Sequence, residues 1–296
     1  MRIWSALVKR NIKMFFKDKG LFFTSMITPL ILLVLYITFL GNVYRDSFET
    51  AFPKGMEIPD QLLDAAVGGQ LISSLLAVCC VTVAFCSNML MVQDKANGTR
   101  KDFTVAPVKK TTLALSYYTA TLGCTLLICL VACGVGFIYL ANIGWYLSAM
   151  DVVFLILDIF LLVMFGVALS SVINFFLSTQ GQISAVGSIV SSMYGFLCGA
   201  YMPISQFGEG LRNALAFLPG THATSLLRNH TLRGVFAELE AKGYPDEVIN
   251  ILQDVIDCNI YFFDTQVPLW TMYLILGGSV LLLIGIYVIL NTAKKR

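Results

Sequence analysis

Charged side chains are scarce in this sequence, and their scarcity excludes an ordinary soluble fold. Asp, Glu, Lys and Arg make up 13% of the 296 residues, whereas apolar residues make up 57%. Soluble globular domains have about 25% charged and about 45–50% apolar residues. Uncharged runs of about 20 residues, the length that a helix needs to cross a bilayer, recur along the chain. The composition therefore predicts an all-α integral membrane protein.

Motifs that bind nucleotides are also missing. The chain has no G-x-x-x-x-G-K-[ST] loop and no dinucleotide fingerprint, so it lacks the glycine loops that hold phosphates. If ATP drives this protein, another polypeptide binds it. No basic stripe interleaved with aromatic residues accompanies the net charge of +2, so we expect no nucleic-acid partner. No cluster of nucleophile and base is visible, and we predict no catalytic residues.

Residues typical of metal sites and disulfide frameworks are sparse. The two histidines, His222 and His230, lack the companion Glu or Cys of a zinc motif. We expect no metal and interpret both as residues of a loop or of the lipid headgroup region. Seven of the eight cysteines lie in apolar runs, as small hydrophobic side chains do. Only Cys258 lies in a long polar segment, where we expect a free thiol.

The apolar runs predict six transmembrane helices. Their expected ranges are 21–40, 67–92, 112–140, 152–176, 183–201 and 267–290. Residues 1–19 are basic, with Arg10, Lys13 and Lys17 among the cations, and their apolar residues fall mostly on one side of a helix. This pattern predicts an amphipathic helix in the membrane interface. The whole chain forms one membrane domain.

Basic residues are distributed unequally between alternate loops. The N-terminus, the loop 93–111 and the C-terminal tail hold fourteen Lys and Arg residues, and the other loops hold six. Because positive residues are retained in the cytoplasm, both termini are expected to be cytoplasmic in a plasma membrane, with 202–266 as an extracellular loop. Within that loop, Ile204 to Leu218 is amphipathic and too short to span, so it predicts a re-entrant segment before the last span. A short external helix is expected over 246–263.

Asp158 is the one acid expected inside the membrane. Such acids are costly and suggest a function, but pairing with a neighbouring polar group is the alternative that we favour.

Small and polar residues concentrate on the second and fifth spans. Small residues let helix backbones approach closely within one subunit or across two. Polar groups within a span favour a helix interface or a wet cavity. We predict a subunit seam or substrate path at Ser73, Ser87, Asn88, Ser184, Ser188, Ser191, Gly195 and Gly199.

The segment after the second span resembles the first cytoplasmic loop of type-2 ABC exporter permeases. That family typically shows Glu-Arg-Glu, one residue, Gly-Thr, and then a short apolar helix that ends in Pro-Val. The matching residues here, with Phe103 in the apolar helix, are Asp94, Lys95, Gly98, Thr99, Pro107 and Val108. Ala96 replaces the second acid, and Lys101-Asp102 reverses the usual charge order.

Two other regions are similar to the same family: the basic N-terminus that leads into the first span, and residues 199–203 with their continuation to Leu227-Arg228. The resemblance implies an exporter subunit that pairs with an identical or related permease and docks onto a cytoplasmic ABC ATPase, which binds ATP and Mg. Asp94, Lys95, Gly98, Thr99, Phe103 and Pro107 would couple to that ATPase. Second and fifth spans of both subunits would line a path for amphipathic drugs, antibiotics, lipid-like molecules or peptides, in a bacterial cell membrane.

Other functions remain open from the sequence. A channel or ion-coupled secondary transporter would work without an ATPase and would use Asp158 as its charged centre. An intramembrane enzyme would need a catalytic cluster, and none is visible. An assembly or sensor subunit could have the same architecture without transport.

Overall fold

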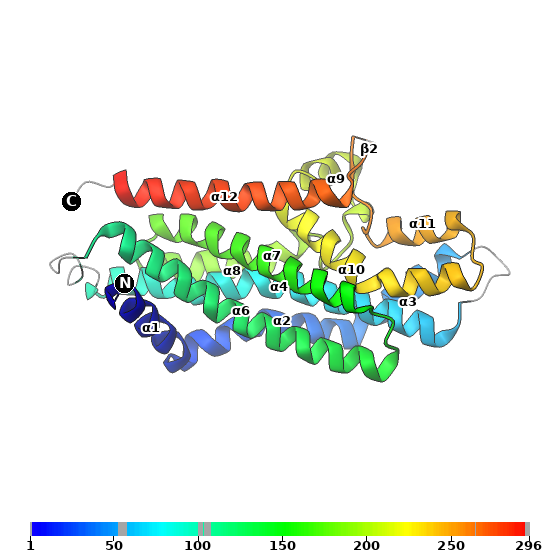
Figure 1. Cartoon of the computed structure of the whole chain (residues 1–296), viewed down its shortest axis with the longest axis horizontal. Coiled ribbons are helices and arrows are strands. Elements are labelled where there is room, and N and C mark those ends of the chain that lie inside the picture. Colours follow the sequence, from blue (N-terminus) through cyan, green and yellow to red (C-terminus); the bar gives the residue numbers. More distant parts are fainter. Residues whose placement is uncertain (1, 53–57, 100–102, 104–107, 264, 294–296) are drawn as a thin grey trace.

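The computed structural model describes the chain except for residues 1, 53–57, 100–102, 104–107, 264 and 294–296. The described part is helical apart from one short strand pair, β1 (Tyr261–Phe262) with β2 (Thr265–Gln266). The helices run side by side in an elongated bundle (Figure 1). The all-α prediction is confirmed.

Five helical segments of the described chain are long and apolar enough to cross a bilayer. The first, Lys19–Thr50, runs through α2 (Lys19–Leu35), the π-helical turn η1 (Tyr36–Leu40) and α3 (Gly41–Ala51). The others are α4 (Asp60–Ala96), α6 (Lys110–Ile143), α7 (Ala149–Phe176) and α12 (Leu269–Ala293). Each overlaps a predicted span. The remaining predicted span, 183–201, falls on α8 (Gln180–Leu197), which is not one of the five, so a sixth crossing stays a prediction.

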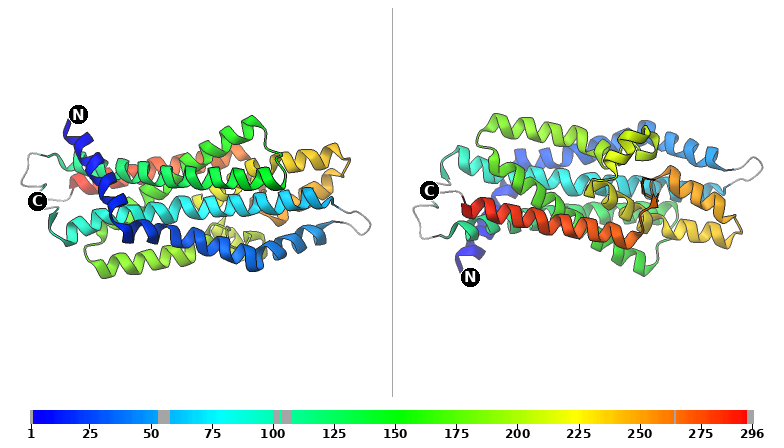
Figure 2. Two further views of the ribbon diagram at one scale, coloured as in Figure 1. Left: turned by 90° about the horizontal axis from the view of Figure 1, so that it is seen from below. Right: turned by 90° about the horizontal axis from the view of Figure 1, so that it is seen from above.

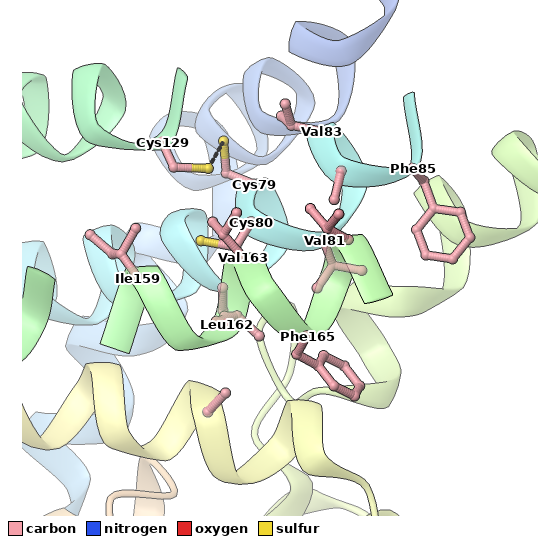
Figure 3. Close-up of a cluster of buried hydrophobic side chains, with 14 of the residues drawn as sticks. Cys79, Cys80, Val81, Val83, Phe85, Cys129, Ile159, Leu162, Val163 and Phe165 are labelled. Atoms are coloured by element: carbon pink, nitrogen blue, oxygen red, sulfur yellow. Dashed lines mark hydrogen bonds between the residues drawn. The ribbon is translucent and has the colours of Figure 1, made fainter. Parts of the chain in front are cut away.

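Helix α4 is the centre of the bundle. It contacts α2, α6, α7, α8 and α10 (Pro219–Ala241), and 94% of its most apolar stretch is buried, against 17% for α12. Figure 3 shows its side chains packed beside those of α7. The two backbones approach closely at Gly166, where a Cβ would lie 2.9 Å from the Cys80 carbonyl oxygen. The polar residues of α4 therefore face other helices.

The segment 202–266 is more helical than the sequence predicted. The expected re-entrant range 204–218 holds only a single turn, η2 (Ile204–Gln206), and a seven-residue helix, α9 (Glu209–Leu215). The long helix that follows, α10, was not singled out, and it packs against α4, α7 and α12. His222 and His230 lie on α10 and are buried, so their interpretation as loop or headgroup residues is wrong.

A second hydrophobic cluster occupies one end of the bundle, which we call the outer end. It joins α3, the first turns of α4, the C-terminal half of α10, and α11 (Asp246–Val255), the expected external helix. Phe48, Leu62 and Leu252 are among its buried side chains. On its surface Arg45 forms ion pairs with Glu49, Asp60 and Asp64.

Both described chain ends lie at the opposite end, the inner end (Figure 1). The segment 97–109 and the α7–α8 connection lie there too. The N-terminal helix α1 (Arg2–Lys17) crosses this end obliquely (Figure 2) and packs against α6. Phe15 is buried, whereas Ile3 and Trp4 are exposed. An amphipathic helix is thus present where one was predicted.

Candidate functional site

A groove of about 1090 Å³ lies between α2 and α8, and we call it the groove below. Its inner end is lined by Gln93 of α4 and by Gln180, the first residue of α8. Its outer end is lined by Gln206 and Ile256. It therefore follows most of the bundle's long axis.

The two walls of the groove differ in chemistry. The α2 wall is mostly apolar, with Ile27, Ile31 and Leu35. The α8 wall carries the hydroxyl groups of Ser184, Ser188, Ser191 and Ser192. Among the described residues that line the groove there is no Asp, Glu, Lys, Arg or His. An amphipathic molecule can place its apolar side on α2 and its hydrogen-bonding groups on α8.

The fifth-span residues of the predicted seam divide into two groups. Ser184, Ser188 and Ser191 line the groove. Gly195 and Gly199 instead build the turn that ends α8: a Cβ at Gly195 would lie 2.4 Å from the Tyr201 ring, and Gly199 has a φ of +74°, which favours glycine.

The second-span residues of the predicted seam point into the protein. Ser73 donates to the Gln70 carbonyl at 3.0 Å, and Ser87 lies 3.0 Å from the Thr125 hydroxyl. The Asn88 amide donates to Ser170 and Ser171 at 3.0 and 2.9 Å. All three α4 side chains are buried, and α4 contributes Cys86, Met89 and Gln93 to the groove instead. Helix α2 therefore forms the wall that the sequence analysis assigned to the second span.

At the inner end, the residues predicted to couple to an ATPase meet those of the N-terminal helix. The Arg10 guanidinium of α1 pairs with both carboxylate oxygens of Asp94, and its second nitrogen lies 2.9 Å from Oδ1. The Tyr117 hydroxyl of α6 donates to Asp94 Oδ2 at 2.5 Å. Arg10 also lies over the Phe103 ring, 5.4 Å from its centroid. The hydrogen bond from Asp94 raises the pKa of Arg10, so this side chain stays charged at physiological pH.

Lys95, the next residue, points to the other side of α4. Its Nζ donates to the carbonyl oxygens of Asn174, Phe175 and Leu177 at 2.9, 2.7 and 3.0 Å. The ammonium group also lies 5.5 Å from the Phe175 ring centroid. These carbonyls belong to the C-terminal end of α7, where helix carbonyls lack partners within the helix and where a cation is favoured.

The rest of the predicted coupling segment is described in part. Gly98 has a φ of +79° and follows the end of α4, so it supplies the sharp turn that the sequence indicated. Thr99 is half-buried. Pro107, Lys101 and Asp102 lie outside the described residues. Lys13 and Lys17 of α1 are exposed.

Asp158 is buried and joins three helices. Its Oδ2 lies 2.6 Å from His230 Nδ1 of α10, and its Oδ1 accepts from the Tyr273 hydroxyl of α12 at 2.6 Å. The Phe154 ring stacks on His230 at 5.1 Å. Asp158 thus has the polar neighbours that the structural interpretation required. Its partners could not be identified from the sequence because they are 72 and 115 residues away.

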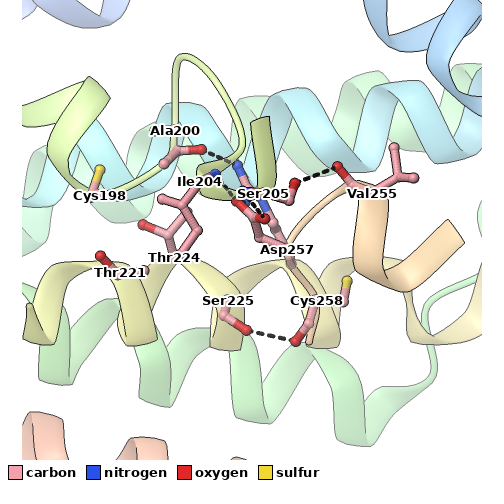
Figure 4. Close-up of polar contacts among 12 residues, drawn as sticks. Cys198, Ala200, Ile204, Ser205, Thr221, Thr224, Ser225, Val255, Asp257 and Cys258 are labelled. Atoms are coloured by element: carbon pink, nitrogen blue, oxygen red, sulfur yellow. Dashed lines mark hydrogen bonds and ion pairs between the residues drawn. The ribbon is translucent and has the colours of Figure 1, made fainter. Parts of the chain in front are cut away.

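A buried arginine, which sequence reasoning missed, fastens the segment that follows α8. Arg228 of α10 donates to the Gly199 carbonyl and lies 3.3 Å from Asp257 Oδ2. Asp257 in turn accepts from the backbone N–H groups of Ile204 and Ser205 (Figure 4). Burial raises the pKa of Asp257, and the charge of Arg228 opposes that shift. The match of Gly199 to Arg228 in the family-like stretch was the available signal.

Comparison with known proteins identifies the class of this arrangement. The family model described as "ABC-2 type transporter" matches residues 2–231. The matched range includes α1, the Arg10–Asp94 pair, both walls of the groove as far as Gln206, and all of α10 up to Thr231. No curated protein matches the chain.

Proposed function

We propose, because this chain belongs to the ABC-2 type transporter family and is the transmembrane subunit of such a transporter, that it works as an exporter together with a second permease subunit. As an ABC-2 membrane permease domain it lacks the ATPase, and ABC-2 permeases associate with an ABC ATPase. ATP and Mg would be held by that separate protein at the inner end, which would face the cytoplasm. The multi-pass chain would cross the plasma membrane six times, with α8 as the fifth crossing.

The groove is the observation that carries this proposal. It is long, it is open beside α2 and α8, and its walls combine an apolar side with a serine-rich side. A second permease subunit, identical or related, would close it from the open side and complete the substrate path. The absence of Asp, Glu, Lys, Arg and His among its described lining residues favours substrates whose enclosed part is uncharged. Amphipathic drugs, antibiotics, lipid-like molecules and peptides with apolar side chains fit that description.

Transport in inside-out membrane vesicles tests the proposal. Vesicles that contain this chain and its native ATPase are expected to accumulate a fluorescent amphipathic probe when MgATP is added, and vanadate should stop the accumulation. Ser188→Trp should reduce ATP-dependent accumulation at least tenfold, because the indole fills the groove beside α2. Leu281→Trp is the matched control, since Leu281 is 73% exposed on α12 and faces away from the groove.

Accumulation that follows an ion gradient and ignores ATP would contradict the proposal and favour the alternative, an ion-coupled secondary transporter or channel. Equal losses in Ser188→Trp and Leu281→Trp would show that the groove has no special role.

A further inference from the structure

The contacts of Lys95 connect the coupling segment to the groove. Lys95 lies in the last turn of α4, three residues before Gly98. Its three hydrogen bonds reach the last carbonyls of α7 and the carbonyl of Leu177, the first residue after α7. A lysine that was only a contact for an ATPase would point toward solvent, whereas this side chain points toward α7.

The α7–α8 connection is short and held by its own hydrogen bonds. Thr179 caps α8 in a reciprocal pair with Gln182, whose side chain also accepts from the Ser178 N–H at 2.8 Å. Only Ser178 separates Leu177, bound by Lys95, from that cap. Because a short, hydrogen-bonded turn transmits displacement, movement of the Leu177 carbonyl carries the first turn of α8 with it.

Helix α8 is weakly held elsewhere along its length. Ile183 and Gly195 are its buried residues, and α4 is the helix that it chiefly contacts. Elements with few buried apolar contacts move at low free-energy cost. The position of the inner half of α8, including Gln180 and Ser184 on the groove wall, therefore depends strongly on how its first turn is anchored.

The last turn of α4 is itself firmly anchored on its other side. Asp94 is bound there by Arg10 of α1 and by Tyr117 of α6. A push on the segment 97–109 thus reaches a turn that is bonded to α1 and α6 through Asp94 and to α7 through Lys95.

We propose that Lys95 is a positioning residue that ties the α7–α8 turn to the last turn of α4, so that displacement of the segment 97–109 moves the inner half of α8 and changes the width of the groove. This inference rests on the proposed function, because the displacement would come from the ATPase. Lys95 acts through hydrogen bonds to α7 and touches neither substrate nor nucleotide.

Nucleotide-dependent labelling of α8 tests this role. Ser184→Cys places a thiol on the inner part of the groove wall, and the eight native cysteines are all buried. In inside-out vesicles with the native ATPase, the alkylation rate of this thiol by a maleimide should change severalfold between nucleotide-free and MgATP–vanadate conditions. Adding Lys95→Met should reduce that change to less than a third, while ATP hydrolysis and co-purification with the ATPase persist.

Two variants provide the controls. Lys95→Arg keeps a cation that can donate to the same carbonyls and should retain most of the nucleotide effect. Lys9→Met removes an exposed cation of α1 at the same end of the molecule and should leave the effect unchanged. If Lys95→Met does not accumulate in the membrane, Lys95→Gln, which keeps a shorter donor, takes its place with the same expected loss.

Several outcomes would overturn the inference. An unchanged nucleotide effect in Lys95→Met would show that α8 moves without this link. Loss of ATPase binding would make Lys95 a docking contact, and failure of both Lys95→Met and Lys95→Gln to fold would make it purely structural. If the unsubstituted chain with Ser184→Cys shows no nucleotide effect at all, the proposed function itself fails, and the inference fails with it.

Discussion

Buried polar side chains of this protein are paired with partners from distant helices. Asp158 illustrates the consequence, because its carboxylate binds both His230 and Tyr273. A buried acid with two hydrogen-bond partners is sufficiently explained by helix packing, and a transport role adds nothing that this geometry requires. The structural interpretation of Asp158 is therefore the one that we carry forward.

Asp158→Asn should leave ATP-dependent transport intact and lower stability by about 1–3 kcal/mol, since the amide keeps the shape but not the charge-assisted bonds. The apparent melting temperature of the detergent-purified protein measures the loss. Tyr273→Phe, which removes one hydrogen bond, should show a smaller decrease. A stable Asp158→Asn protein whose transport no longer responds to pH or cations would instead make Asp158 functional.

Cys258 is a second case in which burial decides the chemistry. The sequence places this thiol in a polar segment, yet it is 1% exposed, and burial raises its pKa to about 12. Because the thiolate is the reactive form, only about one thiol in ten thousand is ionised at pH 8. We expect Cys258 to resist iodoacetamide in the native protein at pH 7–8 and to react after denaturation, as measured by mass spectrometry. Rapid native labelling would mean that the segment around Asp257 opens readily.

Among the helices, α1 depends on one ion pair for its orientation across the inner end. Arg10 is its link to α4, and Asp94 is nearly inaccessible to water once the pair has formed. Removing the guanidinium leaves a buried carboxylate with Tyr117 as its remaining printed donor.

Arg10→Met should therefore destabilise the protein by about 1.5–3 kcal/mol, the usual contribution of a hydrogen bond to a charged group. The melting temperature in detergent provides the measurement, and limited proteolysis should show earlier cleavage within α1. Lys13→Met removes an exposed cation from the same helix and should change neither quantity. Equal behaviour of the two variants would mean that the pair contributes nothing to the docking of α1.

For the molecule as a whole, the orientation in the membrane is the main prediction. The fourteen Lys and Arg residues of the N-terminus, the segment 93–110 and the tail gather at the inner end, and six lie elsewhere. Positive residues are retained in the cytoplasm, so the inner end should be cytoplasmic and α3, α10 and α11 should face the exterior.

Thiols introduced by Asn97→Cys and Glu240→Cys test this orientation, because both positions are exposed and the native cysteines are buried. In intact cells a membrane-impermeant maleimide should label Glu240→Cys and leave Asn97→Cys unlabelled. Permeabilised cells should show labelling at both positions. The reverse pattern would place the segment 97–109 outside and remove the basis for ATPase coupling there.

The amount that could be predicted from sequence differs between the two parts of the candidate site. Ser184, Ser188 and Ser191 were correctly expected to share a face, because helical spacing is a local property. The similar polar residues of α4 could not be placed, since a helix surrounded by five others buries its serines wherever they fall. Helix α10 escaped notice for a related reason: its many polar residues resemble a loop, and only their burial against α4, α7 and α12 explains them.

Local composition and periodicity were enough to establish a helical membrane protein, most of its spans and the absence of nucleotide-binding loops, because each depends on consecutive residues and on the thickness of a bilayer. The tertiary structure alone decided that α2 and α8 form the groove, that Asp94 and Lys95 point to opposite sides of α4, and that Asp158 meets His230 and Tyr273. Those pairings join residues far apart in the chain, and they depend on how helices pack, which no single stretch of sequence specifies.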